Sequence, residues 1–366
     1  MAVLMIKWHP RFWQLTLGLL KANFALRDYV QNLLAKNWLP TIGPSISLTS
    51  LSDVIVNLVL DQVLFDNGRK KGEREFAKAD VEVAAVALAE DTNDRAATGL
   101  ELYLAAAEGR EKASLAETTL EDMAHFEYIM SERVRGGVSD MSDLNIIRQK
   151  LSEIRTAQTA GRETTRSAIA ELNAMSVQPL QGVRGLTKLN VSSNDAQPLK
   201  VTKAEAEKTR AIAAAKVDRV SQLPGVSLSG TIGENSNIGV KAGGAQLGFG
   251  TGARLKAIEL AKETAGRRVS QANEDSNRAL RKLESQIAAK TRQASEATNL
   301  TAQAKNNLDL FQAQYKAGQR QVMDVVGVYE TFSRAQESEV TLKYEAATLR
   351  VEMARILGVL ADGDLI

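Results

Sequence analysis

Residue types that usually carry catalysis or bind metals are scarce in this chain of 366 amino acids. It contains no cysteine, which excludes disulfides, thiolate metal sites and a cysteine nucleophile. Its two histidines, His9 and His125, have no candidate ligands nearby in the sequence, so His125 is expected to face solvent or a neighbouring helix. No nucleophile stands with a general base in a pattern typical of an active site. The sequence therefore predicts a protein that is not an enzyme, with no catalytic residues, no cofactor and no metal.

Other binding chemistries are also disfavoured. The stretch GFGTGARLKA (248–257) is rich in glycine but lacks the Gly-Lys-Ser/Thr ending of a phosphate-binding loop. The net charge is only +2, so the composition gives no sign of the basic surface that binds nucleic acid. The chain contains no run of eighteen apolar residues, so no transmembrane helix is expected. The N-terminal stretch is interrupted by charged residues and followed by no small-residue cleavage site, so it is expected to form part of a helix.

The polar residues that stand out follow a glycine in a stretch that occurs twice. QYKAGQRQVMDVV (314–326) and RVRGGVSDMSDLN (133–145) match with an offset of 181, and each breaks a helical pattern at a glycine turn. The matching pairs are Gly137 with Gly318, Asp143 with Asp324, and Leu144 with Val325. A repeat of this size indicates a duplicated structural unit.

The elements that position these turns repeat as well. Leu39-Pro40 matches Leu223-Pro224, and LFDNG (64–68) matches GFGTG (248–252), both with an offset of 184. Each half predicts a helix, two short strands, a long helix, a glycine turn and a long returning helix. The predicted divisions are a first repeat at 1–178 with strands at about 44–65, a linker at 179–198, and a second repeat at 199–366 with strands at about 225–249.

The long helices carry a packing stripe. No proline occurs in 45–178 or 225–366, which permits uninterrupted helices. Beyond the second glycine turn, apolar residues recur at alternating steps of three and four, and the first half repeats the series with small residues such as Gly161. This pattern predicts antiparallel coiled-coil hairpins whose helices approach closely. Each long helix would extend for roughly 100 Å, which a compact globular domain does not need.

The strands alternate apolar and polar residues. In VIVNLVLDQ, Val56, Leu58 and Leu60 point one way, whereas Asn57 and Asp61 point the other. Two hypotheses fit this alternation: a half-buried sheet of a soluble domain, or part of a membrane barrel with an apolar outside. Four strands cannot close a barrel alone, so the second hypothesis requires oligomerisation. Aromatic residues beside the strands favour it, because such residues sit at membrane interfaces; these are Trp38, Phe65 and Phe249.

Taken together, these landmarks resemble the TolC family of outer-membrane channel proteins. HPRF (9–12) looks like a variant of the family's Asn-Pro-Glu-Leu element, and WLPTIGPSISL and QLPGVSLSG resemble its helix-to-strand entry. LFDNGRKKGE resembles its strand-to-helix exit, and YKAGQRQVMDVV resembles its periplasmic tip very closely. The resemblance covers nearly the whole chain in the right order.

The resemblance implies a homotrimer whose four strands per protomer make a 12-stranded β-barrel in the outer membrane of a Gram-negative bacterium. The helical hairpins would form a tunnel through the periplasm. Such a channel gives passive exit to substrates of a drug-efflux or type I secretion system. Its expected partners are a periplasmic adaptor (membrane fusion) protein, an inner-membrane pump and outer-membrane lipid, and no nucleic acid.

The resemblance also assigns roles at the tips. The glycine turns at Gly137 and Gly318 would be the ends of the hairpins, where the tunnel closes. The family's gate uses a tyrosine and an arginine around the second turn, here Tyr315 and Arg320. Their partners in the first hairpin fall on Ser142 and Asp143, and the serine keeps the hydroxyl of the family's threonine.

The family's constriction has two aspartates one helical turn apart. This chain has Asp324 at the first position and Gly327 at the second, so it would form one acidic ring that binds cations.

An alternative hypothesis is a periplasmic structural or adaptor coiled-coil protein without a membrane barrel. The aromatics beside the strands favour the channel.

Overall fold

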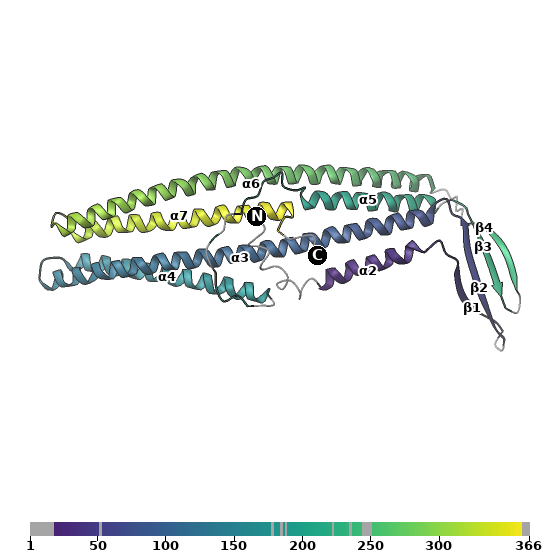
Figure 1. Cartoon of the computed structure of the whole chain (residues 1–366), viewed down its shortest axis with the longest axis horizontal. Helices are drawn as coiled ribbons and strands as arrows, with labels where there is room; N and C mark the ends of the chain where they lie inside the picture. Colours follow the sequence, from purple (N-terminus) through teal and green to yellow (C-terminus); the bar gives the residue numbers. More distant parts are fainter. Residues whose placement is uncertain are drawn as a thin grey trace. The chain divides into compact units, whose positions relative to one another are not determined.

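The computed structural model of the chain describes residues 18–50, 53–176, 179–183, 186, 189–221, 223–233, 236–243 and 251–360. The N-terminal segment expected to be helical therefore lies largely outside the described residues, and so does Phe249. The helices are α2 (Gly18–Ala35), α3 (Arg69–Arg135), α4 (Met141–Ala174), α5 (Leu199–Val220), α6 (Thr251–Lys316) and α7 (Val322–Leu357) (Figure 1). The strands are β1 (Thr41–Ser50), β2 (Asp53–Phe65), β3 (Gly225–Ile232) and β4 (Asn237–Gly243). The predicted fold class, mainly α with long helical hairpins and a small sheet, is confirmed.

The chain divides into two compact units. The tip unit is built mainly from Thr92–Ala196 and Arg278–Leu365, and the sheet unit from Thr16–Asp91 and Gln197–Asn277. The long helices α3 and α6 each contribute to both units.

In the tip unit, α3 with α4 and α6 with α7 form the two hairpins. The predicted stripe on α4 is confirmed, because most of its members are buried; these are Leu144, Ile147, Leu151, Gly161, Ala168 and Leu172. Helix α7 buries Val325, Ala346 and Met353 of its predicted stripe and also buries a second stripe that the pattern did not predict. The second stripe comprises Val326, Tyr329, Val340, Tyr344, Val351 and Ala354. Helix α7 therefore packs on two sides, whereas one stripe suffices for α4.

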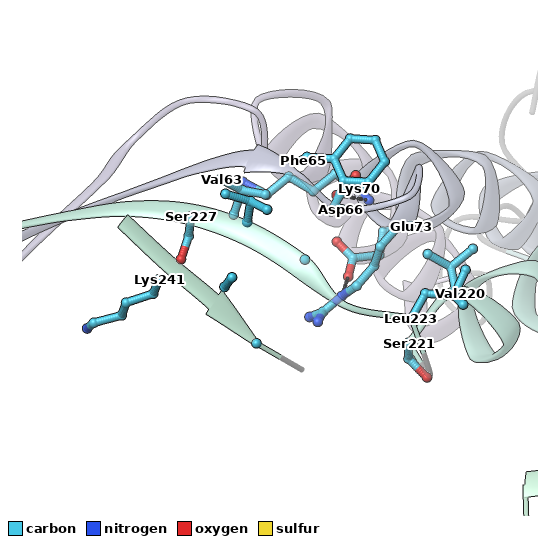
Figure 2. Close-up of a pocket in the computed structure, with 15 residues that line it drawn as sticks. Val63, Phe65, Asp66, Lys70, Glu73, Val220, Ser221, Leu223, Ser227 and Lys241 are labelled. Atoms are coloured by element: carbon cyan, nitrogen blue, oxygen red, sulfur yellow. Dashed lines mark hydrogen bonds and ion pairs between the residues drawn. The ribbon is translucent and has the colours of Figure 1, made fainter. Parts of the chain in front are cut away.

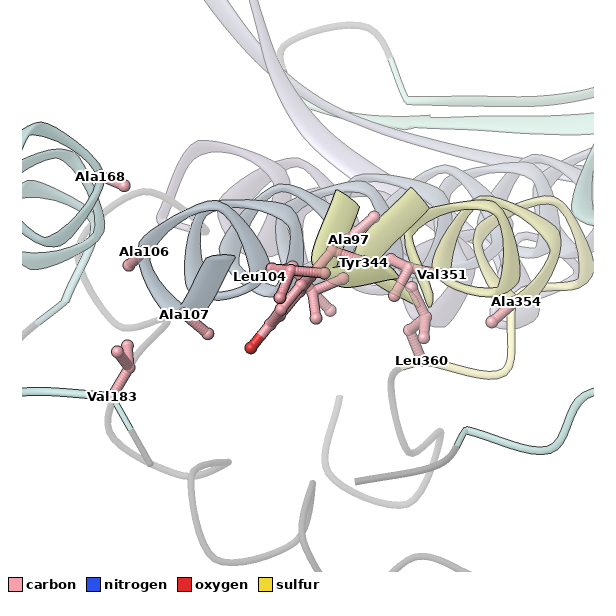
Figure 3. Close-up of a cluster of buried hydrophobic side chains, with 12 residues drawn as sticks. Ala97, Leu104, Ala106, Ala107, Ala168, Val183, Tyr344, Val351, Ala354 and Leu360 are labelled. Carbon is pink, nitrogen blue, oxygen red and sulfur yellow. The ribbon is translucent and has the colours of Figure 1, made fainter. Parts of the chain in front are cut away.

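The second stripe of α7 is where the two hairpins join. Tyr344, Val351 and Ala354 share a core cluster with Ala97, Leu104 and Ala107 of α3 (Figure 3). Hydrogen bonds and an ion pair also join α7 to α3 at this contact. The Tyr344 hydroxyl donates to Glu111 Oε2 at 2.9 Å, and Lys343 Nζ lies 2.8 Å from both oxygens of that carboxylate.

A further polar contact between α7 and α3 lies at the end of α7. Asn93 is 1% exposed; its Nδ2 donates to the Arg355 carbonyl at 2.6 Å, and its Oδ1 accepts the Leu360 N–H at 3.0 Å. These bonds satisfy backbone groups that the end of a helix leaves unpaired. The chain beyond α7 is thereby held against α3.

Two glycines let α3 and α4 approach closely. A Cβ built on Gly161 would lie 2.7 Å from the Gly109 carbonyl oxygen, and one built on Gly109 would lie 2.8 Å from the Gly161 carbonyl oxygen. The Thr165 hydroxyl donates across the same contact to the Ala106 carbonyl at 3.2 Å. Gly161, the small residue predicted in the α4 stripe, thus allows the backbones of α3 and α4 to approach closely, as small residues do in other helix contacts.

In the sheet unit, the four strands form one antiparallel sheet in the order β1-β2-β3-β4. The pairing of β2 with β3 joins the two repeats. Strand β1 begins at Thr41, earlier than the predicted start at about 44. It runs through Pro44 because proline is tolerated in an edge strand.

The strand pairing places apolar residues opposite apolar residues or glycine, and polar residues opposite polar ones. Leu60 lies opposite Ile42 on β1 and Gly230 on β3, and Gly230 lies opposite Ile238 on β4. One residue along, Asp61 lies opposite Thr41 and Ser229. Because side chains alternate between the faces of a strand, the sheet has an apolar face and a polar face. Among the described helices, none is long and apolar enough to cross a membrane.

Candidate functional site

Both hairpins of the tip unit turn through the same backbone motif. Gly137 has φ of +69° and Gly318 has φ of +75°, the left-handed region that glycine adopts without strain. Two backbone bonds close each turn: Val138 and Gln319 donate to the carbonyls of Arg133 and Gln314 at 2.8 and 2.9 Å, while each glycine N–H donates one turn back. This is the Schellman ending of a helix. It explains why both predicted tip glycines are needed.

Asp324 has a local role at the tip that the sequence reasoning missed. Its Oδ2 accepts the backbone N–H of Gln321 at 3.1 Å, and the Gln321 side chain accepts the N–H at Asp324 in return. This reciprocal capping box satisfies two of the N–H groups that a helix start leaves unpaired. The signal was visible in the sequence as Gln-x-x-Asp after a glycine turn. Asp143 stands at the matching third position of α4, where its carboxylate also favours the helix start.

Arg320 is exposed but is held in place on its own hairpin. Its Nε donates to Gln314 Oε1 at 3.1 Å, and its guanidinium carbon lies 4.4 Å from the centre of the Phe311 ring. Stacking of this kind orients a planar guanidinium. A guanidinium carries five N–H donors, so the contact with Gln314 leaves donors for other acceptors.

The other predicted gate residues lie around the turns, and no hydrogen bond joins them to one another in the described part of the chain. Ser142 is exposed and Asp143 is half-buried at the start of α4. Tyr315 is half-buried and packs against a core cluster at the tip end. That cluster joins both hairpins through Phe126 of α3, Ile147 of α4, Leu308 of α6 and Val325 of α7, among others.

A second polar contact near the tip was not predicted. Tyr329 is buried, and its hydroxyl donates to Asp122 Oδ2 at 2.5 Å, which connects α7 to α3. Burial raises the pKa of the Tyr329 phenol, and the neighbouring Asp122 carboxylate raises it further, so the phenol stays protonated as a donor. Its ring also contacts Phe126 and Phe332 edge-on.

Gly327, which stands where the family has a second acid, is exposed on α7. A Cβ built there would have no atom within 4 Å. The position therefore accommodates a side chain, and its glycine is not required by packing.

The apolar face of the sheet is exposed in this chain. The exposed fractions are 60% for Val56, 65% for Ile232, 79% for Ile238 and 63% for Val240. Trp38 and Phe65, predicted as interface aromatics, are 61% and 57% exposed beside the strand ends. A contiguous apolar surface of this kind marks a contact with another protein chain or with a membrane.

One cavity of about 320 Å³ lies where the sheet meets the helices (Figure 2). Its acidic groups are already engaged, because Asp66 accepts the Gly68 and Lys70 N–H groups and Glu73 pairs with Arg69. In the described part of the chain, no cluster of histidine, aspartate and glutamate could hold a metal ion.

The sequence matches no protein-family model and no curated protein. Its structure, however, is similar to solved outer-membrane channels. VceC from Vibrio cholerae superposes with a TM-score of 0.80 at 14% identity, covering 93% of this chain and 92% of VceC. The open state of MtrE from Neisseria gonorrhoeae gives 0.79 at 15% identity, covering 95% and 89%. CmeC of Campylobacter jejuni gives 0.76 at 14% identity, covering 95% and 84%. The chain therefore has the channel-tunnel fold of the TolC-like outer-membrane channels, as its motifs predicted.

Proposed function

We propose that three copies of this chain form an outer-membrane channel that gives substrates passive exit across the periplasm and the outer membrane. The observation that carries the proposal is the exposed apolar face of the sheet, in a chain with the channel-tunnel fold. Residues such as Ile232 and Ile238 would face lipid in a barrel of three sheets. The polar face, with Asp61 and Ser229, would line the water-filled interior.

The same face argues against a periplasmic coiled-coil protein without a barrel. Such a protein would have to leave Val56, Leu58, Ile232, Ile238 and Val240 in water, although exposed apolar surface is costly when it is contiguous. Trp38 and Phe65 then serve as interfacial anchors at the periplasmic side of the barrel.

The tips provide a gate at the far end of the tunnel. In a trimer, Arg320 and Tyr315 donate hydrogen bonds to Asp143 and Ser142 of a neighbouring hairpin and hold the entrance closed. A periplasmic adaptor and an inner-membrane pump then open it, in drug efflux or type I secretion. The chain itself performs no catalysis.

Single-channel recording tests this function. Purified protein added to a planar bilayer is expected to give unitary current steps, and light scattering in detergent is expected to give three chains per particle. A monomer that stays soluble without detergent and gives no current would contradict the proposal.

Asp324 gives a sharper prediction. Three carboxylates around the axis form an oxygen-lined anionic ring, which suits hard multivalent cations. A trivalent cation added on the periplasmic side is expected to block the current, and the block should be lost in Asp324→Asn. Asparagine removes the charge but keeps a carbonyl oxygen that can accept the Gln321 N–H.

Gly327→Asp is the matched gain-of-function variant. It adds a second carboxylate three residues on, one helical turn away, at a position with room for a side chain. Block is expected at a several-fold lower cation concentration than in the parent. Identical block in the parent and in Asp324→Asn would place the cation elsewhere.

A further inference from the structure

Two opposite charges lie at the same end of the sheet. The charged residues within the four strands are Asp53, Asp61 and Lys241. Asp61 pairs with Thr41, where β1 begins after α2, and Lys241 lies near the end of β4, beside the cavity at the helices (Figure 2). Both Asp61 and Lys241 therefore lie at the end of the sheet nearest the helices, which we call the helix end. Asp53 begins β2 at the opposite end.

These two charges also lie on the polar face of the sheet. Strand pairing places Asp61 opposite Ser229, and Ser229 opposite Gly239. Residues opposite one another share a face of the sheet, and so do residues two apart on one strand. Lys241 is two residues from Gly239, so it lies on the same face as Asp61. This is the face proposed above to line the interior of the barrel.

Neither charge is neutralised within the chain. The side chains of Asp61 and Lys241 are exposed, and among the described residues neither makes an ion pair or a hydrogen bond. Two strand spacings and two residues along the strand separate them, which places their Cα atoms roughly 12 Å apart. Between them, β3 presents only the small side chains of Ser227 and Ser229 on this face. Both charges are therefore free to act on solutes that pass over the polar face.

In the proposed trimer, the order of the strands would repeat around the barrel. A barrel of three sheets has β1, β2, β3 and β4 in turn, so Asp61 on β2 and Lys241 on β4 would occupy every second strand. The strands that alternate with them, β1 and β3, contain no charged residue. Three carboxylates and three ammonium groups would thus alternate in sign around the helix end of the lumen.

We propose that Asp61 and Lys241 form this ring of alternating charges, which we call the charge belt, and that it determines the ion selectivity of the helix end of the barrel. A ring of charges of one sign selects ions of the opposite sign. The charge belt has three charges of each sign and no net charge, so it admits solutes of either sign. The inference rests on the homotrimer proposed above and assigns the barrel a specificity element separate from Asp324 at the tip.

Charged thiol reagents test the charge belt, because the chain has no cysteine of its own. Asp61→Cys and Lys241→Cys each place one thiol in the belt of the full-length protein in detergent. Each variant is treated with a cationic and an anionic methanethiosulfonate of similar size in 10 mM salt, where the screening length is about 30 Å. The ratio of the two rates reports the local potential, since ionisation of the thiol affects both reagents alike.

The two positions are expected to prefer reagents of opposite sign. At the thiol of Asp61→Cys, three lysines remain, so the ratio of the anionic to the cationic rate should be several-fold above that of a small free thiol. At the thiol of Lys241→Cys, three aspartates remain, so this ratio should be several-fold below it. Adding Lys241→Gln to the first variant, or Asp61→Asn to the second, should return the ratio to the free-thiol value.

A matched control removes the same charge elsewhere. Lys316→Gln also deletes one cation from each chain, but Lys316 is the last residue of α6, whose other end lies beside the sheet. A helix of 66 residues extends for about 100 Å, far beyond the screening length. Lys316→Gln added to Asp61→Cys should therefore leave the ratio unchanged.

Reversal potentials in a salt gradient test the selectivity itself. They are measured in an Asp324→Asn background, so that the tip ring contributes no charge. Asp61→Lys leaves six cations in the charge belt and should shift the reversal potential toward anion selectivity. Lys241→Glu leaves six carboxylates and should shift it toward cation selectivity. The two substitutions together exchange the charges and restore the balance, so they should return the reversal potential to that of the background.

The outcomes separate this inference from the proposed function. A trimer that conducts, but in which both thiols react at the free-thiol ratio, overturns the charge belt and leaves the channel proposal standing. The same holds if the two charge reversals shift the reversal potential in the same direction or leave it unchanged. A particle of one chain that gives no current overturns the channel proposal itself.

Discussion

Replacing Arg320 by serine together with Tyr315 by phenylalanine is expected to raise single-channel conductance several-fold. Each substitution removes a donor that would hold the closed entrance against Ser142 or Asp143 of a neighbouring hairpin. A charge-assisted hydrogen bond contributes about 1.5–3 kcal/mol, less where water reaches it. Three copies lost together are enough to move the equilibrium from mostly closed to mostly open.

The arginine must carry most of this effect, because its guanidinium is already oriented by Gln314 and Phe311. Lys316→Ser is the matched control. Lys316 is an exposed cation beside the same turn, so its loss changes the charge at the tip equally. If the double variant forms intact trimers whose conductance equals that of the parent, the hydrogen-bonded gate is refuted.

Gly161→Ala is expected to lower the free energy of unfolding by about 1–3 kcal/mol, as overpacking of a well-packed contact does. The new Cβ would meet the Gly109 carbonyl oxygen at 2.7 Å, and backbone cannot move aside as a flexible side chain can. Gly109→Ala should act alike, since the contact is reciprocal. Denaturant unfolding followed by circular dichroism measures both.

Gly327→Ala is the control for helix propensity. It also lies in a helix, but open space surrounds it, so alanine there should stabilise the protein by about 0.5–1 kcal/mol. Opposite signs for Gly161→Ala and Gly327→Ala are the expected result. If both variants stabilise the protein, α3 and α4 do not approach each other as closely as described.

The sequence could predict the features that repeat. The turns at Gly137 and Gly318 were predictable because a duplicated helix break needs a residue that accepts positive φ. The stripe on α4 was predictable because a single partner helix imposes a single spacing. The second stripe on α7 was not, because Tyr329 and Tyr344 present hydroxyls that suggest solvent until Asp122 and Glu111 are seen to accept from them.

Other features depend on partners far apart in the sequence. The contribution of Gly109 depends on Gly161 facing it across two helices, which no local pattern reveals. The start of β1 was misplaced because proline usually marks the end of a strand, whereas here β1 runs through Pro44, opposite Leu58 of β2, its one partner within the chain. The cap formed by Asp324 could have been predicted locally, because Gln321 and Asp324 follow the glycine turn at the spacing of a capping box.

The bond between Tyr329 and Asp122 has a mechanical consequence. Tyr329 lies seven residues beyond Val322, where α7 begins, so about 10 Å of α7 extends past it toward the tip. Deeper along α7, Tyr344 and Arg355 contact α3 again through Glu111 and Asn93. An outward force at the tip would therefore act first on the apolar packing of Val325 and on this single polar contact, and only afterwards on the contacts at Glu111 and Asn93.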